Sequence, residues 1–162
     1  MKRLLRLVFV AIGFAGTGVL TERLFDNVLG WTSSLAVLPF GILAGILCVR
    51  PLPLIPVVAA LHCGVWFLAF HLALSSSTHL ALPLLSAGFI GGFGVAAATS
   101  IGCRRLFDLR ILALTGLAGA AVAPLFVLYN RGGSYPLFAV WQATAGTVLY
   151  AFSRDQHHGD NL

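Results

Sequence analysis

Acidic side chains are the scarcest charged class in this sequence of 162 residues. The chain has five Asp and Glu against ten Lys and Arg, and charged residues of both signs make up only 9% of it. The acids are Glu22, Asp26, Asp108, Asp155 and Asp160. None of them falls in the middle of a long apolar run, so we do not expect a carboxylate relay for protons or sodium inside a membrane.

Motifs of catalysis and of nucleotide binding are also missing. The sequence has no H-E-x-x-H metal motif, no G-x-S-x-G nucleophile motif and no phosphate-binding loop. Cys48, Cys63 and Cys103 imply no structural disulfide, and the histidine spacing resembles no dedicated metal site. His62 and Cys63 are neighbours, but adjacent helix positions point about 100° apart, which suits a base and its nucleophile badly. We therefore expect neither an enzyme nor a bound cofactor or metal.

What the chain does have is apolar sequence in long runs. Hydrophobic residues make up 59% of it, and its mean hydropathy is +0.95. A helix of about 20 apolar residues crosses the hydrocarbon core of a bilayer, and six segments of about that length fit into the chain. The sequence predicts an all-α polytopic membrane protein, a bundle of about six transmembrane helices over residues 1–152, followed by a short cytoplasmic tail at 153–162. The expected spans are residues 4–20, 33–49, 54–74, 80–102, 111–129 and 135–152.

Three features of the sequence bear on whether the first span is cleaved and on where two other spans bend. Lys2, Arg3 and Arg6 precede the first apolar run, as in a signal peptide, but no clear cleavage site follows, so we expect this span to be retained. Pro39 falls inside the second expected span, where it predicts a kink. Pro124 falls towards the end of the fifth expected span, where a second kink is expected.

The basic residues predict how the bundle lies in the membrane. If the N-terminus is inside, only Arg23 and Arg131 fall on the outer side. The inner side then holds Lys2, Arg3, Arg6, Arg50, Arg104, Arg105, Arg110 and Arg154. This asymmetry follows the positive-inside rule and predicts that both termini are cytoplasmic, with a bacterial inner membrane as the expected location. Because the positive charges mark span ends and form no single patch, nucleic acid is not an expected partner.

One apolar segment has an unusual number of small residues. On a helix, one narrow arc of the segment would consist of Ala87, Gly91, Gly94, Ala98 and Gly102. Small side chains let neighbouring membrane helices approach closely, so this arc is expected to pack against other helices. The side with Phe89 and Phe93 is expected to face away from them. A lumen or substrate groove lined by the small residues is the functional alternative.

His62 is the one ionisable side chain expected well inside a span. At about 1.5 Å per residue from the inner helix ends, His62 lies about 12 Å deep and Gln142 about 15 Å deep, so the two share a layer. A neutral hydrogen-bonded pair would satisfy both side chains, and a solute or proton site is the alternative. His71 lies on the opposite face of the same helix, so the two histidines cannot hold one haem iron. If the protein binds a substrate, His62 and Gln142 are its expected binding residues.

The first functional hypothesis is a small-solute permease or the membrane-embedded substrate-binding subunit of a transporter. Six short spans around a glycine-faced helix would suit a site in the middle of the bundle. The first span carries Ala11-x-x-x-Ala15. With this motif, its size and its topology, the chain resembles the substrate-binding components of energy-coupling-factor vitamin transporters, which dock on their partner through such small residues. The resemblance implies other membrane-protein subunits as partners.

The alternative hypothesis is a non-catalytic subunit or assembly factor of a larger membrane protein complex. The small-residue faces would then bind the helices of partner subunits within the lipid bilayer. Arg104, Arg105 and Arg110, in the most charged loop of the chain, would contact an acidic partner or anionic lipid. The two hypotheses differ in whether the isolated chain binds a solute.

Overall fold

The computed structural model describes residues 2–27, 30–75, 81–125 and 137–154, and this part of the chain is helical without strands. Its α-helices are α1 (Lys2–Asn27), α2 (Leu38–Cys48), α3 (Ile55–Ser75), α4 (Ala81–Ser100), α5 (Leu109–Val122) and α7 (Leu137–Arg154). Short 3-10 helices connect some of them: η1 (Gly30–Val37), η2 (Leu52–Leu54) and η3 (Arg104–Phe107). The prediction of an all-α bundle of about six helices is confirmed. The expected tail at 153–162 lies almost entirely outside the described residues.

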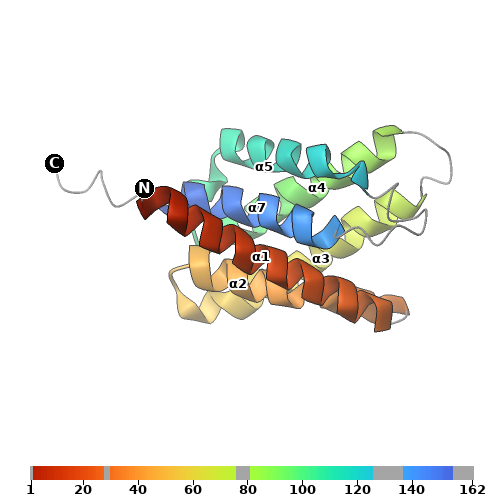
Figure 1. The fold of residues 1–162 in the computed structure, drawn as a ribbon, viewed down its shortest axis with the longest axis horizontal. Coiled ribbons are helices and arrows are strands. Elements are labelled where there is room, and N and C mark those ends of the chain that lie inside the picture. Colours follow the sequence, from red (N-terminus) through yellow and green to blue (C-terminus); the bar gives the residue numbers. More distant parts are fainter. Residues whose placement is uncertain (1, 28–29, 76–80, 126–136, 155–162) are drawn as a thin grey trace.

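Helices that follow one another in the sequence run in opposite directions, side by side in one bundle (Figure 1). α7 contacts α1, α2, α4 and α5, and α1 packs mainly on α7. α3 packs between α2 and α4, and α4 packs most extensively on α5. The start of α1 and the end of α7 therefore share one end of the bundle, together with the connections that carry Arg50 and Arg104. We call this end the basic end and the opposite one the far end.

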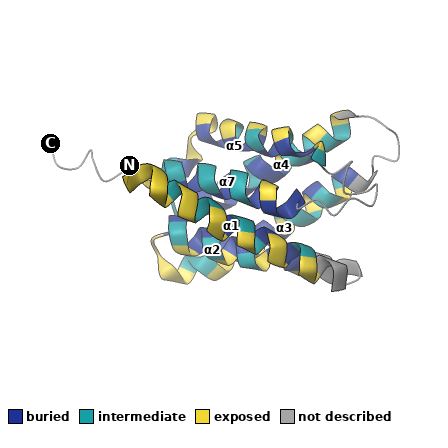
Figure 2. Cartoon of the chain, in the orientation of Figure 1, coloured by how far each residue is buried: buried dark blue, intermediate teal, exposed yellow. Residues whose placement is uncertain are grey.

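Three segments are long and apolar enough to cross a membrane: Lys2–Leu24, Leu52–Ala73 and Leu82–Ser100. Ser34–Cys48 and Leu109–Val122 are shorter apolar helices. Large apolar side chains are exposed along the bundle, such as Leu4, Leu68 and Leu82, which are 69%, 64% and 72% exposed. Figure 2 shows exposed residues along the outer helices. Water would not tolerate so much exposed apolar surface, and these helices indicate that the protein associates with a membrane.

Two prolines end or begin helices where kinks were expected. η1 ends at Val37 and α2 begins at Leu38, so Pro39 lies in the first turn of α2, where its missing N–H removes no helical hydrogen bond. Pro124 lies just after the last residue of α5, Val122. The chain therefore changes helix type at Pro39, and the bend expected there stays a prediction. The kink expected at Pro124 also stays a prediction, because the chain after Leu125 lies outside the described residues.

The small-residue arc of α4 lies against several neighbours. A Cβ atom on Gly94 would lie 2.6 Å from Val65 on α3, and one on Gly91 would lie 3.1 Å from Trp141 on α7. A Cβ on Gly102, just beyond α4, would overlap Val49. The other two members of the arc, Ala87 and Ala98, are each 6% exposed. At Gly94 and Gly102 even a methyl group would not fit without moving a neighbour.

The aromatic side of α4 does not face away from the bundle. A Cβ atom on Gly116 of α5 would lie 2.7 Å from the Phe89 ring, so the two are in close contact. Phe89 also stacks on Phe93 at 5.9 Å between ring centroids. The prediction for this side is therefore wrong, because the small residues of α5 accept the phenylalanine as the small residues of α4 accept bulky neighbours.

Candidate functional site

His62 is completely buried and bonds to α4. Its Nε2 lies 3.1 Å from the carbonyl oxygen of Val95 and 3.1 Å from Oγ1 of Thr99. The Thr99 hydroxyl itself donates to the Val95 carbonyl at 2.7 Å. Because a carbonyl can only accept, this geometry assigns the ring proton to Nε2. Nδ1 is then a buried lone pair without a partner among the described residues.

The space around Nδ1 is closed. A Cβ atom on Gly41 of α2 would lie 3.1 Å from His62 Nδ1 and 2.8 Å from the Cα of Ala59. Helix α2 therefore approaches the imidazole with bare backbone. A solute could not reach Nδ1 without separating α2 from α3, so His62 in this arrangement ties α3 to α4 and lines no cavity.

Gln142 is also completely buried, but it bonds to α1. Its Nε2 donates to Oγ1 of Thr21 at 2.8 Å, and its Oε1 accepts from the hydroxyl of Thr17 at 2.8 Å. The Thr17 hydroxyl also lies 2.8 Å from the carbonyl oxygen of Phe14, and its single proton serves one acceptor at a time. Gln142 thus fastens α7 to α1 through two side chains one turn apart.

The structure does not pair His62 with Gln142. Each has its own partners on a different helix, and the Phe40 ring packs beside His62 at 5.4 Å between centroids. Phe40 also packs against Phe14 at 5.3 Å and Trp141 at 5.9 Å, filling the interior of the bundle with rings. The expected pair is therefore wrong as a contact. Similar depth in two helices does not fix the direction in which either side chain points.

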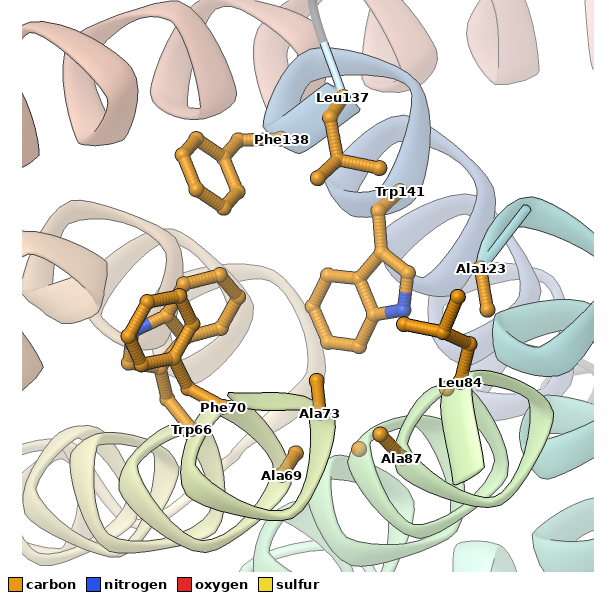
Figure 3. A pocket seen from close by; sticks show the side chains of 12 residues that line it. Trp66, Ala69, Phe70, Ala73, Leu84, Ala87, Ala123, Leu137, Phe138 and Trp141 are labelled. Atoms are coloured by element: carbon orange, nitrogen blue, oxygen red, sulfur yellow. The ribbon is translucent and has the colours of Figure 1, made fainter. Parts of the chain in front are cut away.

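A different feature of the bundle has room for a ligand. A cavity of about 70 Å³ lies between α3, α4, α5 and α7 at the far end of the bundle (Figure 3). Four rings form its aromatic wall: Trp66, Phe70, Phe138 and Trp141. The rest of the lining is Ala69, Ala73, Leu84, Ala87, Gly88, Gly91, Ala123 and Leu137. We call this cavity the aromatic pocket.

The rings of the aromatic wall hold one another in place. Trp66 stacks on Phe70 at 5.9 Å between centroids, with an interplanar angle of 16°. It meets Phe138 edge-on at 5.0 Å and Trp141 edge-on at 6.2 Å. Offset stacked and edge-to-face pairs at these distances are the favourable ring geometries. The wall is therefore built before any ligand arrives.

Helix spacing explains the shape of the pocket. Residues three or four apart on a helix share a face, which groups Trp66 with Phe70 on α3 and Phe138 with Trp141 on α7. The same rule groups Ala87 with Gly91 on α4, opposite the rings. The substrate-binding residues predicted from the sequence are polar, and none of them is a ring of this pocket. The signal that could have revealed it is a pair of aromatic residues three or four apart on two helices, together with a similarly spaced pair of small residues on a third.

The lining carries no charged side chain, and its polar atoms are the indole N–H groups of its two tryptophans. Nε1 of Trp66 is buried without a hydrogen-bond partner among the described residues. Nε1 of Trp141 lies on the side of the ring that faces Leu84 and Ala123 (Figure 3), and it bonds to none of the described residues. Within this part of the chain, no group of three or more His, Cys, Asp or Glu could hold a metal ion.

The remaining candidate residues lie at the basic end. Arg104 is exposed and Arg105 half-buried in η3, and Arg110 is exposed near the start of α5. The backbone N–H of Arg110 donates to Oδ1 of Asp108 at 2.8 Å, which caps α5. These arginines are far from the aromatic pocket along the helices, so they belong to a surface and not to the same site.

The fold and the pocket define a class of protein: an all-α, membrane-associated helical bundle with an apolar, aromatic cavity between four of its helices. Comparison of the chain with protein-family models, curated proteins and solved structures finds no match. The function must therefore be argued from this chain's own residues.

Proposed function

We propose that this chain is a membrane-embedded binding protein for a small solute, either the substrate-binding subunit of a transporter or a small permease. The observation that carries the proposal is the aromatic pocket, to which four helices contribute. Binding sites for small molecules are concave, mostly apolar, largely preformed and common between the helices of bundles. The site proposed for the solute is therefore this pocket, whose lining includes neither His62 nor Gln142.

The energetic cost of the cavity supports the proposal. At about 24 cal/mol per Å³, a fully enclosed empty cavity of about 70 Å³ would cost about 2 kcal/mol of stability, and this pocket, which is partly open, costs less. A Leu in place of Ala73 or Ala87 would fill such a space. A ligand that occupies the pocket would recover the lost contacts, and apolar cavities are known to stay dry and bind apolar molecules.

The basic end of the bundle supports a direction of entry for the solute. Lys2, Arg50, Arg104 and Arg154 share the basic end, which under the positive-inside rule would be cytoplasmic. The aromatic pocket would then lie in the outer half of the membrane. A solute would enter from outside the cell, as expected for an uptake system in a bacterial inner membrane.

A second candidate, a non-catalytic subunit or assembly factor, is favoured by a separate observation. Gly16 on α1 and Gly64 on α3 are exposed, and a Cβ atom on either would meet nothing within 4 Å. Small residues at such places allow a partner helix to pack closely. Ala11 and Ala15 of the predicted docking motif are half-buried on α1. A binding subunit of a transporter would also need such a surface.

Purification in a mild detergent separates the two candidates. A solute-binding protein should gain thermal stability when small ring compounds are added, and a variant with a filled pocket should not. A structural subunit should co-purify with other chains in fixed stoichiometry and show no solute-dependent shift. If the isolated chain shows no shift with any compound that fits the pocket, the binding proposal fails.

A further inference from the structure

We propose that the ligand of the aromatic pocket is a neutral, flat ring compound that carries a hydrogen-bond acceptor at its edge. This inference rests on the proposed binding function and adds the chemical class of the solute. It follows from three properties of the pocket: the shape of its walls, the absence of charge in its lining and the position of one indole N–H.

The rings around the pocket predict a flat ligand. In Figure 3 the rings of Trp66, Phe70, Phe138 and Trp141 border several sides of the cavity, and Ala69, Ala73 and Ala87 lie on the side opposite Phe138. A ring compound can stack on aromatic side chains at centroid distances of about 4.5–7 Å. Side chains no larger than a methyl group leave room for the second face of that ring.

The volume limits the size of the ligand. A single water needs about 10–15 Å³ of such space, so a cavity of about 70 Å³ accepts roughly five to seven water-sized groups. This corresponds to one small ring at most. A long acyl chain or a bulky polycyclic lipid exceeds this space, which argues against the pocket as a lipid site.

The lining predicts that the ligand is uncharged. None of the lining residues can supply a counter-charge. A carboxylate or phosphate moved into such surroundings would lose its hydration without compensation. An organic cation could gain some energy from the ring faces, but the rings here are in contact with one another edge-on and do not form an open cage around one point.

The indole N–H of Trp141 is the reason we expect the ligand to carry a hydrogen-bond acceptor. Its side chain is 8% exposed, and its indole nitrogen can only donate a hydrogen bond. No described residue accepts that bond, and in Figure 3 the nitrogen lies at the pocket side of α7, towards Leu84 and Ala123. The apolar lining offers this donor no side-chain acceptor, and an acceptor on the edge of the ligand would satisfy it.

The test uses matched single-ring probes with the purified protein in detergent at mildly alkaline pH. Pyridine has one ring nitrogen as acceptor, benzene has the same shape without it, and N-methylpyridinium is the cationic version. Dissociation constants are measured by quenching of tryptophan fluorescence and checked by thermal shift. Pyridine should bind about fivefold more tightly than benzene, the factor expected for one net hydrogen bond. N-methylpyridinium should bind more weakly than both.

Variants assign the binding to the pocket and to Trp141. Ala73→Leu, which fills the pocket, should abolish binding of both neutral probes, whereas Ala60→Leu, on the exposed face of the same helix, should leave it unchanged. Ala123→Leu fills the pocket from α5 and replaces Ala73→Leu if that variant does not fold. Trp141→Phe should reduce pyridine affinity to that of benzene and leave benzene affinity nearly unchanged.

The outcomes separate the two proposals. If neither neutral probe binds, or if both bind equally to the filled variants, the pocket is no binding site and the proposed function falls with the inference. If both probes bind with equal affinity and only in the open pocket, the function stands and the requirement for an acceptor is overturned. If the cation binds most tightly, the function stands and the assignment of a neutral ligand is overturned.

Discussion

Replacement of Gly92 by Ala tests whether the closeness of α4 and α5 stabilises this bundle. A Cβ atom on Gly92 would lie 2.9 Å from the carbonyl carbon of Thr115, 3.1 Å from the Cα of Gly116, and closer still to the Thr115 carbonyl oxygen. All three are backbone atoms, which cannot rotate out of the way. Since non-bonded carbons prefer about 3.5–4.0 Å, α4 and α5 must separate by roughly 0.5–1 Å.

The expected cost follows from that separation. Overpacking a tight contact by one methyl group typically costs about 1–3 kcal/mol, and in this bundle the neighbouring close contact between Gly88 and Gly119 would loosen as well. The matched control is Gly64→Ala on α3, where the new methyl group would meet nothing within 4 Å. In that exposed position Ala should be neutral or slightly stabilising, because Ala has a higher helix propensity than Gly.

The assay is reversible unfolding in mixed micelles with increasing sodium dodecyl sulphate, followed by circular dichroism. Gly92→Ala should unfold at a clearly lower detergent fraction than the unchanged protein, and Gly64→Ala at the same or a higher one. Equal midpoints for the two variants would refute the argument. In that case the α4–α5 contact would carry no stability, and the small residues would need another explanation.

Three further predictions concern the buried polar residues and the topology. His62→Ala should destabilise the fold by about 2 kcal/mol or more through the cavity it leaves, whereas pyridine affinity should stay within about twofold; a complete loss of binding in a folded variant would return the solute site to His62. Gln142→Leu should cost only about 1 kcal/mol, because hydrogen bonds between membrane helices average well below their value in isolation, and a loss above about 3 kcal/mol in the detergent titration would contradict this. With the native cysteines replaced, a cysteine at Asp108 should resist a membrane-impermeant maleimide in intact cells and one at Leu82 should react; the reverse pattern would invert the proposed orientation.

The sequence was sufficient to predict the helices because hydrophobic length and helix ends are local properties. The expected spans at 54–74 and 80–102 correspond closely to α3 (Ile55–Ser75) and α4 (Ala81–Ser100). The same local information could not predict the break at Pro39, where the chain passes from a 3-10 helix to an α-helix. The isolated preference of proline is satisfied equally by a kink and by a first turn, and only packing against the neighbours selects between them.

Contacts between helices were harder to predict than the helices themselves. Depth placed His62 and Gln142 in one layer, but α3 turns His62 towards Thr99 of α4, and α7 turns Gln142 towards Thr21 of α1. The rotation of each helix about its axis depends on where all of its small and large residues find complementary partners. That information is spread over the whole chain, so a pair of residues chosen for polarity alone was a poor guide to the site.

The way the polar side chains are used explains why the one cavity we assign to a solute is apolar. His62, Gln142, Thr21 and Thr99 are fully buried, and each makes a hydrogen bond to a neighbouring helix or to its own. In a membrane, such groups stabilise helix association when they are paired and are costly when they are not. The side chains that line the pocket offer a ligand only the indole N–H groups of Trp66 and Trp141, and that of Trp141 is the one we assign to the solute. Recognition in the aromatic pocket must therefore depend on shape and ring contacts, with a single polar contact to orient the solute.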